Sequence, residues 1–136
     1  MIDKEIIKIA SNTENHGMLD NHTHFSKLKN SICGDEMKVY LIVKNDKIEN
    51  FKYECESCIY CQASVSLLSR NVKNKSIEKV KNLAKQAKNC FEKNNKSFDK
   101  EWKEFDKIMT KNNISRKECL LLPINTTLDA LNKKSL

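Results

Sequence analysis

Glycine and proline are almost absent from this chain of 136 residues, which contains two glycines and one proline. So few of either leave no room for a long flexible linker, and no internal repeat is visible. We therefore expect one domain over residues 1–136, large enough to bury a single modest core. The few positions that these residues occupy, Gly17, Gly34 and Pro123, are correspondingly informative.

A long apolar run is also missing, so no segment has the composition of a membrane-spanning helix. The first ten residues, MIDKEIIKIA, place charges where a signal peptide would have its apolar core, and no small-residue cleavage site follows. These absences predict a cytoplasmic protein without a membrane partner. Disulfides are rare in that compartment, so the six cysteines are expected to be metal ligands, nucleophiles or small buried side chains.

Positive charge is in excess, with a formal net charge of +7 at pH 7. The segment 71–108 contains eleven lysines and six acidic residues, and so carries five of these charges. Its lysines alternate with acidic and apolar residues at helical spacing, as on the solvated faces of amphipathic helices. The aromatic residues recur at core spacing rather than forming a stacking platform. Nucleic-acid binding is therefore not favoured, although a basic surface can help to dock an acidic protein.

Strand patterns occupy the first half of the chain, and helical patterns occupy most of the rest. Residues 37–43 and 47–55 predict a hairpin around the turn sequence KND, and 23–31 offers a third strand. Helical spacing marks the segments 3–12, 58–69, 76–92, 97–109 and 115–131. The last helix opens on SRKE, the pattern of a capping box with Ser115 as the cap. This order predicts an α+β fold, a small three-stranded antiparallel sheet covered by helices.

Three closely spaced cysteines, Cys55, Cys58 and Cys61, lie where the predicted strand passes into a helix. Their spacing resembles a bacterial ferredoxin run, but the required fourth cysteine and proline are replaced by valine and serine. A structural zinc site would need a second close Cys or His pair. A complete local metal cage is therefore not favoured.

A redox pair is a second interpretation, because Cys58 and Cys61 form a Cys-x2-Cys motif at the start of a helix. The alternating strand–helix units of thioredoxin-like folds, and their facing proline loop, are missing. Cys90, beside an apolar stripe, and Cys55, at a strand end, are interpreted as structural. No histidine is predicted as a ligand: His16, His22 and His24 are assigned to loops or the surface.

A site assembled from distant segments is the third interpretation. Cys33 and Asp35 flank a glycine whose positive φ would let both side chains face one ion. Cys58 and Cys119 each fall in the first turn of a predicted helix, where the helix dipole favours a thiolate. Three thiolates and a carboxylate suit zinc or an iron–sulfur cluster and exclude magnesium and calcium as natural occupants. Cys61, one turn beyond Cys58, could line the same site.

The motifs CGD at 33–35, CIYCQASVSLLS after the hairpin and RKECLLLP before the last helix occur in a characteristic order. This order is similar to that of the IscU/SufU/NifU N-terminal family of iron–sulfur cluster assembly scaffolds, and the similarity begins at NHGML, residues 15–19. The resemblance implies the IscU/SufU-like α+β fold. It also implies that zinc or a transient iron–sulfur cluster is held by four residues: Cys33, Asp35, Cys58 and Cys119.

The spacing is most similar to the SufU branch of this family. Sixty residues separate Cys58 from Cys119, Arg116 stands three positions before the last cysteine, and Glu118 replaces the histidine of the IscU branch. The chain departs from the family pattern around Cys58: a cysteine and a serine replace the usual glycines at positions 55 and 57. Cys61 replaces a small residue and makes a further thiol available.

The resemblance implies a scaffold or carrier rather than an enzyme, which receives sulfur from a cysteine desulfurase and serves a downstream iron–sulfur carrier or apo-protein. The alternative is a zinc-dependent sulfurtransferase that passes persulfide sulfur to an assembly complex. By resemblance, Cys33 or Cys119 accepts the persulfide. Asp35, a hard ligand in a soft set, is hypothesised to make the site labile. A more distant alternative is a structural zinc protein that binds nucleic acid.

Overall fold

A computed structural model describes residues 4–92 and 98–133. The elements, in chain order, are α1 Lys4–Ala10, β1 His24–Lys29, β2 Glu36–Lys44, β3 Lys47–Glu56, α2 Ile59–Asn71, α3 Ile77–Glu92, the 3-10 helices η1 Lys100–Lys107 and η2 Lys111–Arg116, and α4 Lys117–Asn132. The strands form an antiparallel sheet in the order β1-β2-β3. The predicted α+β class and three-stranded sheet are confirmed.

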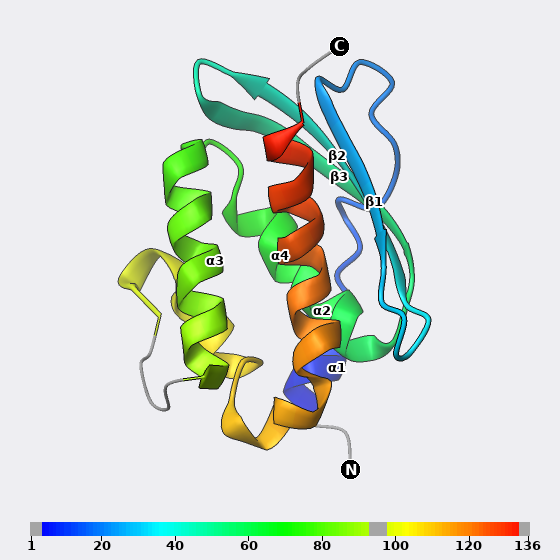
Figure 1. The fold of residues 1–136 in the computed structure, drawn as a ribbon, viewed down its shortest axis with the longest axis vertical. Helices are drawn as coiled ribbons and strands as arrows, with labels where there is room; N and C mark the ends of the chain where they lie inside the picture. Colours follow the sequence, from blue (N-terminus) through cyan, green and yellow to red (C-terminus); the bar gives the residue numbers. More distant parts are fainter. Residues whose placement is uncertain (1–3, 93–97, 134–136) are drawn as a thin grey trace.

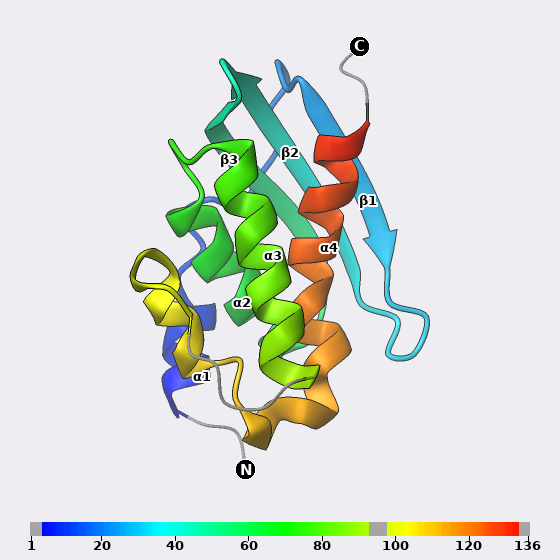
Figure 2. The same cartoon turned by 60° about the vertical axis from the view of Figure 1, so that its left-hand side comes forward.

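The helices gather on one face of the sheet (Figure 1). α4 packs on β1 and β2, α2 packs on β3, and α3 lies against α4 on the side away from the strands (Figure 2). Fully buried apolar side chains between these layers include Phe51, Leu67, Leu83 and Trp102. Within 4–92 and 98–133, no helix combines the length and apolar character needed to cross a bilayer.

The β2–β3 hairpin has a two-residue turn, because Lys44 pairs with Lys47. The turn residues Asn45 and Asp46 have φ values of 53° and 60°. Asparagine and aspartate tolerate this left-handed conformation, and two such residues in succession match the twist of an antiparallel pair. The turn sets the pairing beside it, and a register shift between Ile42 and Val43 separates that pairing from the one that runs to the opposite end, where the site lies.

Helices α2 and α4, which each carry one predicted ligand, are joined through a small buried side chain. Ser64 in α2 is fully buried, and its hydroxyl donates a hydrogen bond to the carbonyl of Leu120 in α4 at 2.6 Å. A larger residue at this position would separate the helices, since packed interiors tolerate little added volume. The run of small residues after Cys58 thus lets the two helices approach closely.

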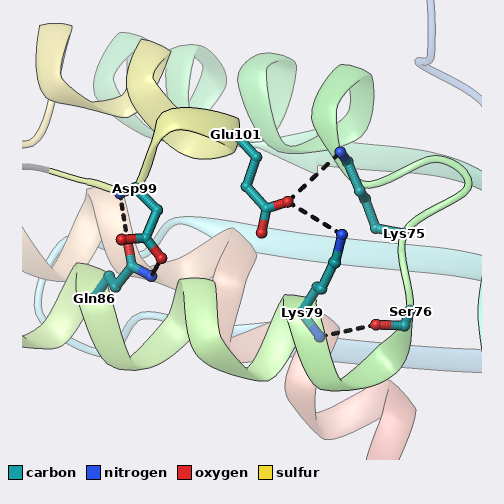
Figure 3. A network of polar contacts seen from close by, with 6 residues as sticks. All are labelled: Lys75, Ser76, Lys79, Gln86, Asp99 and Glu101. Carbon is teal, nitrogen blue, oxygen red and sulfur yellow. Dashed lines mark hydrogen bonds and ion pairs between the residues drawn. The ribbon is translucent and has the colours of Figure 1, made fainter.

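The amphipathic helix predicted over 97–109 is instead the 3-10 helix η1, and residue 97 lies outside the described residues. Trp102 has φ −113° and ψ 17°, which breaks the segment into two turns and places its ring in the core. Polar contacts hold this segment along α3 (Figure 3). Glu101 pairs with Lys79 at 3.4 Å, and Asp99 exchanges hydrogen bonds with Gln86 at 2.8 and 2.9 Å. These tertiary contacts outweigh the helical spacing of the apolar residues, so the segment does not form a regular α-helix.

The capping box predicted at Ser115 is wrong. α4 begins at Lys117 with Arg116 as its N-cap, and no side chain caps the helix. Ser115 is already part of η2, which runs directly into α4. A residue in a helical turn cannot also take the extended conformation that side-chain capping normally requires.

Candidate metal centre

The open end of the β2–β3 hairpin brings the predicted site residues together. Glu36, the first residue of β2, pairs with Glu56, the last residue of β3. The loop before β2 and the connection from β3 to α2 therefore leave the sheet side by side. The loop contributes Cys33 and Asp35, and the connection contributes Cys58, the N-cap of α2.

Gly34 gives the loop its shape. Its φ is +75°, in the left-handed region that glycine adopts without strain, as the sequence predicted. Its amide donates to the carbonyl of Asn30 at 2.7 Å, and the amide of Asn30 donates to the carbonyl of Asp35 at 2.7 Å. The loop is thereby closed with Cys33 exposed at its tip and Asp35 only 6% exposed.

Cys119 reaches this loop from the other end of the chain. It is the third residue of α4 and is buried. Its Sγ lies 3.5 Å from the Sγ of Cys33. One ligand atom from each of Cys33, Asp35 and Cys119 lies within 4.8 Å of the other two, so that a single ion could contact all three.

The carboxylate of Asp35 has one oxygen satisfied and one free. Oδ1 accepts a hydrogen bond from the amide of Cys58 at 3.1 Å, which ties the loop to the start of α2. Oδ2 is buried and has no hydrogen-bond partner among the described residues. A buried carboxylate oxygen left in this way is costly unless a cation lies beside it. The donor set therefore fits a soft or borderline metal ion such as zinc or iron.

Cys58 is less closely placed than the other three residues. It lies outside the group whose ligand atoms fall within 4.8 Å of one another, but its thiol contacts that of Cys119. Its thiol is half-buried. The structure thus brings all four predicted residues to one end of the sheet, with Cys58 at the margin.

The pKa of the Cys119 thiol is raised well above its ordinary value. Burial is the largest cause, followed by contacts with the thiols of Cys33 and Cys58 and with the Asp35 carboxylate. The sequence-based expectation that the helix dipole favours a thiolate at Cys119 is therefore wrong in the metal-free protein. Desolvation outweighs the dipole here, and a metal ion would have to displace the proton.

Two further thiols lie behind the centre. Cys61 is fully buried in the first turn of α2, and Cys55 is half-buried at the end of β3. Burial raises the pKa of both thiols, and the nearby hydroxyl of Ser57 opposes that rise. Neither thiol belongs to the close group formed by Cys33, Asp35 and Cys119.

Arg116 lies over Tyr60 in the first turn of α2. Its guanidinium carbon is 5.2 Å from the centroid of the Tyr60 ring, a cation–π distance. Sequence reasoning selected Arg116 from its spacing to Cys119 but did not identify Tyr60. Tyr60 stands two residues after Cys58 in the sequence. That position predicts a contact with Arg116 only once the starts of α2 and α4 are known to be adjacent.

Comparisons with known proteins show which proteins the chain resembles. A family model described as the NifU-like N terminal domain matches residues 1–96, which include Cys33, Asp35 and Cys58 but end before Cys119. The chain is 30% identical over 135 residues to the iron–sulfur cluster assembly scaffold protein IscU of Thermotoga maritima, covering 99% of this chain and 95% of that protein. It is 31% identical over 74 residues to the zinc-dependent sulfurtransferase SufU of Bacillus subtilis, covering 54% of this chain and 50% of that protein.

Solved structures share the fold. A putative iron–sulfur cluster assembly scaffold protein for the SUF system from Fervidobacterium islandicum superposes with a TM-score of 0.84 at 27% identity, covering 96% of each chain. The N-terminal part of a NifU-like protein from Brucella abortus gives 0.87 at 21% identity, covering 95% of this chain and 90% of that one. The family match over most of the chain and the IscU match over nearly all of it lead to one conclusion: the chain belongs to the NifU-like N-terminal domain family of iron–sulfur cluster scaffolds.

Proposed function

We propose that this protein binds a metal ion or a nascent iron–sulfur cluster through four residues, Cys33, Asp35, Cys58 and Cys119, and receives sulfur from a cysteine desulfurase. The observation that carries the proposal is the buried, unpartnered Oδ2 of Asp35 beside the thiols of Cys33 and Cys119. A cation would satisfy this oxygen and hold the thiols as thiolates. Metal binding would therefore be coupled to proton release, above all from Cys119.

The sequence did not decide whether Cys33 or Cys119 accepts the persulfide. The greater exposure of the Cys33 side chain favours Cys33. Cys33 is exposed at a loop tip, whereas Cys119 is only 4% exposed. The Cys33 thiolate would attack the outer sulfur of the desulfurase persulfide. The S–S bond of the desulfurase then breaks, its cysteine leaves as a thiolate, and Cys33 carries the persulfide without net oxidation or reduction.

Asp35 is the ligand proposed to keep the centre labile. Carboxylate oxygen is a harder donor than thiolate and is a weaker partner for a soft ion or an iron–sulfur cluster. The amide of Cys58 donates to Oδ1, whereas Oδ2 has no hydrogen-bond partner among the described residues and is the oxygen proposed to bind. A centre with one weak position can pass its cluster to a downstream carrier or apo-protein.

The alternative function is a zinc-dependent sulfurtransferase that passes persulfide sulfur to a downstream assembly complex. It is favoured by the similarity to the zinc-dependent sulfurtransferase SufU of Bacillus subtilis. In this case zinc stays bound while sulfur passes through Cys33. The two functions use the same site residues. The scaffold would pass on a cluster, whereas the sulfurtransferase would pass on only the persulfide sulfur.

Anaerobic purification followed by metal analysis and a desulfurase assay tests both functions. A labile iron–sulfur chromophore that transfers to an apo-ferredoxin supports the scaffold. Stable stoichiometric zinc with strong stimulation of a cysteine desulfurase supports the sulfurtransferase. Absence of both, together with steeply salt-dependent nucleic-acid binding, would contradict both and support the structural zinc alternative.

A further inference from the structure

The sulfur atoms of Cys33 and Cys119 are close enough to react with one another. Their Sγ atoms lie 3.5 Å apart, whereas the bonded sulfurs of a disulfide lie about 2.0 Å apart. Cys58 lies outside the group of ligand atoms that fall within 4.8 Å of one another, so Cys119 is the thiol placed directly beside Cys33. A covalent bond between Cys33 and Cys119 requires the two sulfurs to approach by only about 1.5 Å.

The two thiols differ in their access to solvent. Cys33 is exposed at the tip of its loop, whereas Cys119 is buried. The helix that carries Cys119, α4, is joined to α2 by the hydrogen bond from Ser64 to the carbonyl of Leu120. The loop is less confined, since a Cβ at Gly34 would meet nothing within 4 Å. The approach of the two sulfurs therefore falls mainly to the side chain of Cys33.

These differences set the order in which the thiols react. A sulfur donor in solution reaches Cys33 first, as the proposed function requires. Burial, followed by contact with the Cys33 thiol, raises the pKa of the Cys119 thiol, which makes it a weak nucleophile toward donors in solution. Toward a persulfide on Cys33, however, the Cys119 sulfur is held in contact, and such proximity compensates for weak intrinsic reactivity.

A persulfide on Cys33 holds its outer sulfur at a higher oxidation level than the sulfide of an iron–sulfur cluster. Two electrons are needed to convert that sulfur into sulfide. Two thiols supply two electrons when they form a disulfide. The pair formed by Cys33 and Cys119 can therefore carry out this reduction without an external reductant in that step.

We propose that Cys119 releases the sulfur of a Cys33 persulfide as sulfide. The Cys119 sulfur attacks the Sγ of Cys33, and the bond between that Sγ and the outer sulfur breaks. The outer sulfur gains two electrons and leaves as hydrosulfide with the proton of the Cys119 thiol, while the two cysteine sulfurs are oxidised to a disulfide. An external dithiol reduces this disulfide before the next round. The inference rests on the proposed function, in which Cys33 accepts the persulfide.

Sulfur loading of the purified, chelator-treated full-length chain tests the release. A cysteine desulfurase with cysteine loads Cys33 in one arm, inorganic polysulfide loads it in a second, and excess donor is removed. Wild-type protein should release about one sulfide per chain and form the Cys33–Cys119 disulfide, which non-reducing peptide mass spectrometry detects. Cys119→Ser should keep its persulfide at least about tenfold longer, because a hydroxyl cannot form the disulfide.

The matched control is Cys61→Ser, which removes a buried thiol outside the close group and should release sulfide as the wild type does. Circular dichroism spectra establish that each variant is folded. Equal persulfide lifetimes in folded Cys119→Ser and wild type would overturn the release step and leave the proposed function intact. Sulfide release from wild type without the Cys33–Cys119 disulfide, or transfer of the persulfide to Cys119, would do the same.

The two loading arms separate this inference from the proposed function. Loading of Cys33 by polysulfide but not by the desulfurase would contradict the proposed function, and the polysulfide arm would still decide the release step. Failure of both donors to place a persulfide on Cys33 would contradict both.

Discussion

The two ends of this molecule differ in how their acidic side chains are paired. Along α3 and η1, several charged and polar groups have partners: Glu101 contacts Lys75 and Lys79, and Asp99 pairs with Gln86 (Figure 3), although the buried Nε1 of Trp102 has no hydrogen-bond partner among the described residues. At the open end of the hairpin, Asp35 buries a carboxylate oxygen that has no partner among the described residues. Four buried side-chain atoms lack a hydrogen-bond partner among the described residues, in Asn30, Asp35, Ser57 and Trp102, and only the one in Asp35 belongs to an acidic group.

The two kinds of polar group also differ in their contribution to the free energy of folding. The pairs on α3 are partly exposed, and ion pairs of that kind are worth about 0–1 kcal/mol each. A buried polar atom without a partner costs about 1–3 kcal/mol, and a charged one costs more. A cation bound beside Asp35 would therefore satisfy an oxygen that lacks a hydrogen-bond partner among the described residues. The net charge of the chain is a poor guide to its function, because exposed ion pairs of this kind contribute little free energy.

Cys58→Ser should give the largest effect and tests whether Cys58, at the margin of the centre, is a true ligand. Loss of one of three thiolates should lower zinc affinity by about 100-fold or more. Competition against a chromophoric chelator measures this change. Cys90→Ser is the control, because the Cys90 thiol on α3 donates to the Met109 carbonyl and should have no effect on zinc. Equal losses in the two variants would contradict the proposed ligand set.

The affinity for zinc should rise with pH. The raised pKa of Cys119 keeps its thiol protonated at neutral pH in the metal-free protein, so zinc must displace that proton. Each displaced proton makes the apparent affinity rise about tenfold per pH unit. Chelator competition between pH 6 and pH 8 gives the slope. A flat profile would show that Cys119 is already a thiolate or does not bind the ion.

Asp35→Ala should lengthen the lifetime of a bound cluster, by about tenfold, because it removes the hard donor that keeps the centre labile. Its effect on the stability of the metal-free protein combines two opposing changes: the unpartnered Oδ2 is removed, and the Cys58 amide loses its acceptor, Oδ1. Decay of the visible absorption follows the cluster, and urea denaturation gives the stability. Asp99→Ala, in the satisfied network on α3, is the comparison. Faster cluster loss in Asp35→Ala would reject the assigned role.

Glu101→Gln should have the smallest effect. It removes the ion pairs with Lys75 and Lys79, whose side chains are 32% and 53% exposed, and should lower the free energy of unfolding by less than about 1 kcal/mol. Zinc binding should be unchanged. Urea denaturation with and without added salt measures the loss, which salt should reduce. A change in metal affinity would show that the two ends of the molecule are coupled.

Local patterns in the sequence were sufficient for much of the fold. Alternation and turn residues predict the hairpin, which the structure confirms with its turn at Asn45 and Asp46. Helical spacing predicts α2 and α3 to within two residues of their observed ends. The glycine between Cys33 and Asp35 does adopt positive φ. These features depend on residues close in the chain, which is why the sequence alone determines them.

Only the tertiary structure decided what those residues do together. Cys33 and Cys119 are separated by 86 positions, and their approach depends on how α4 packs against the sheet. Burial reverses the pKa expected for Cys119, and the packing of η1 along α3 replaces the regular helix predicted there. The sequence by itself determined the family, the order of the elements and the candidate ligands. Long-range packing decided which thiols meet, which are accessible and which carboxylate oxygen is left without a partner.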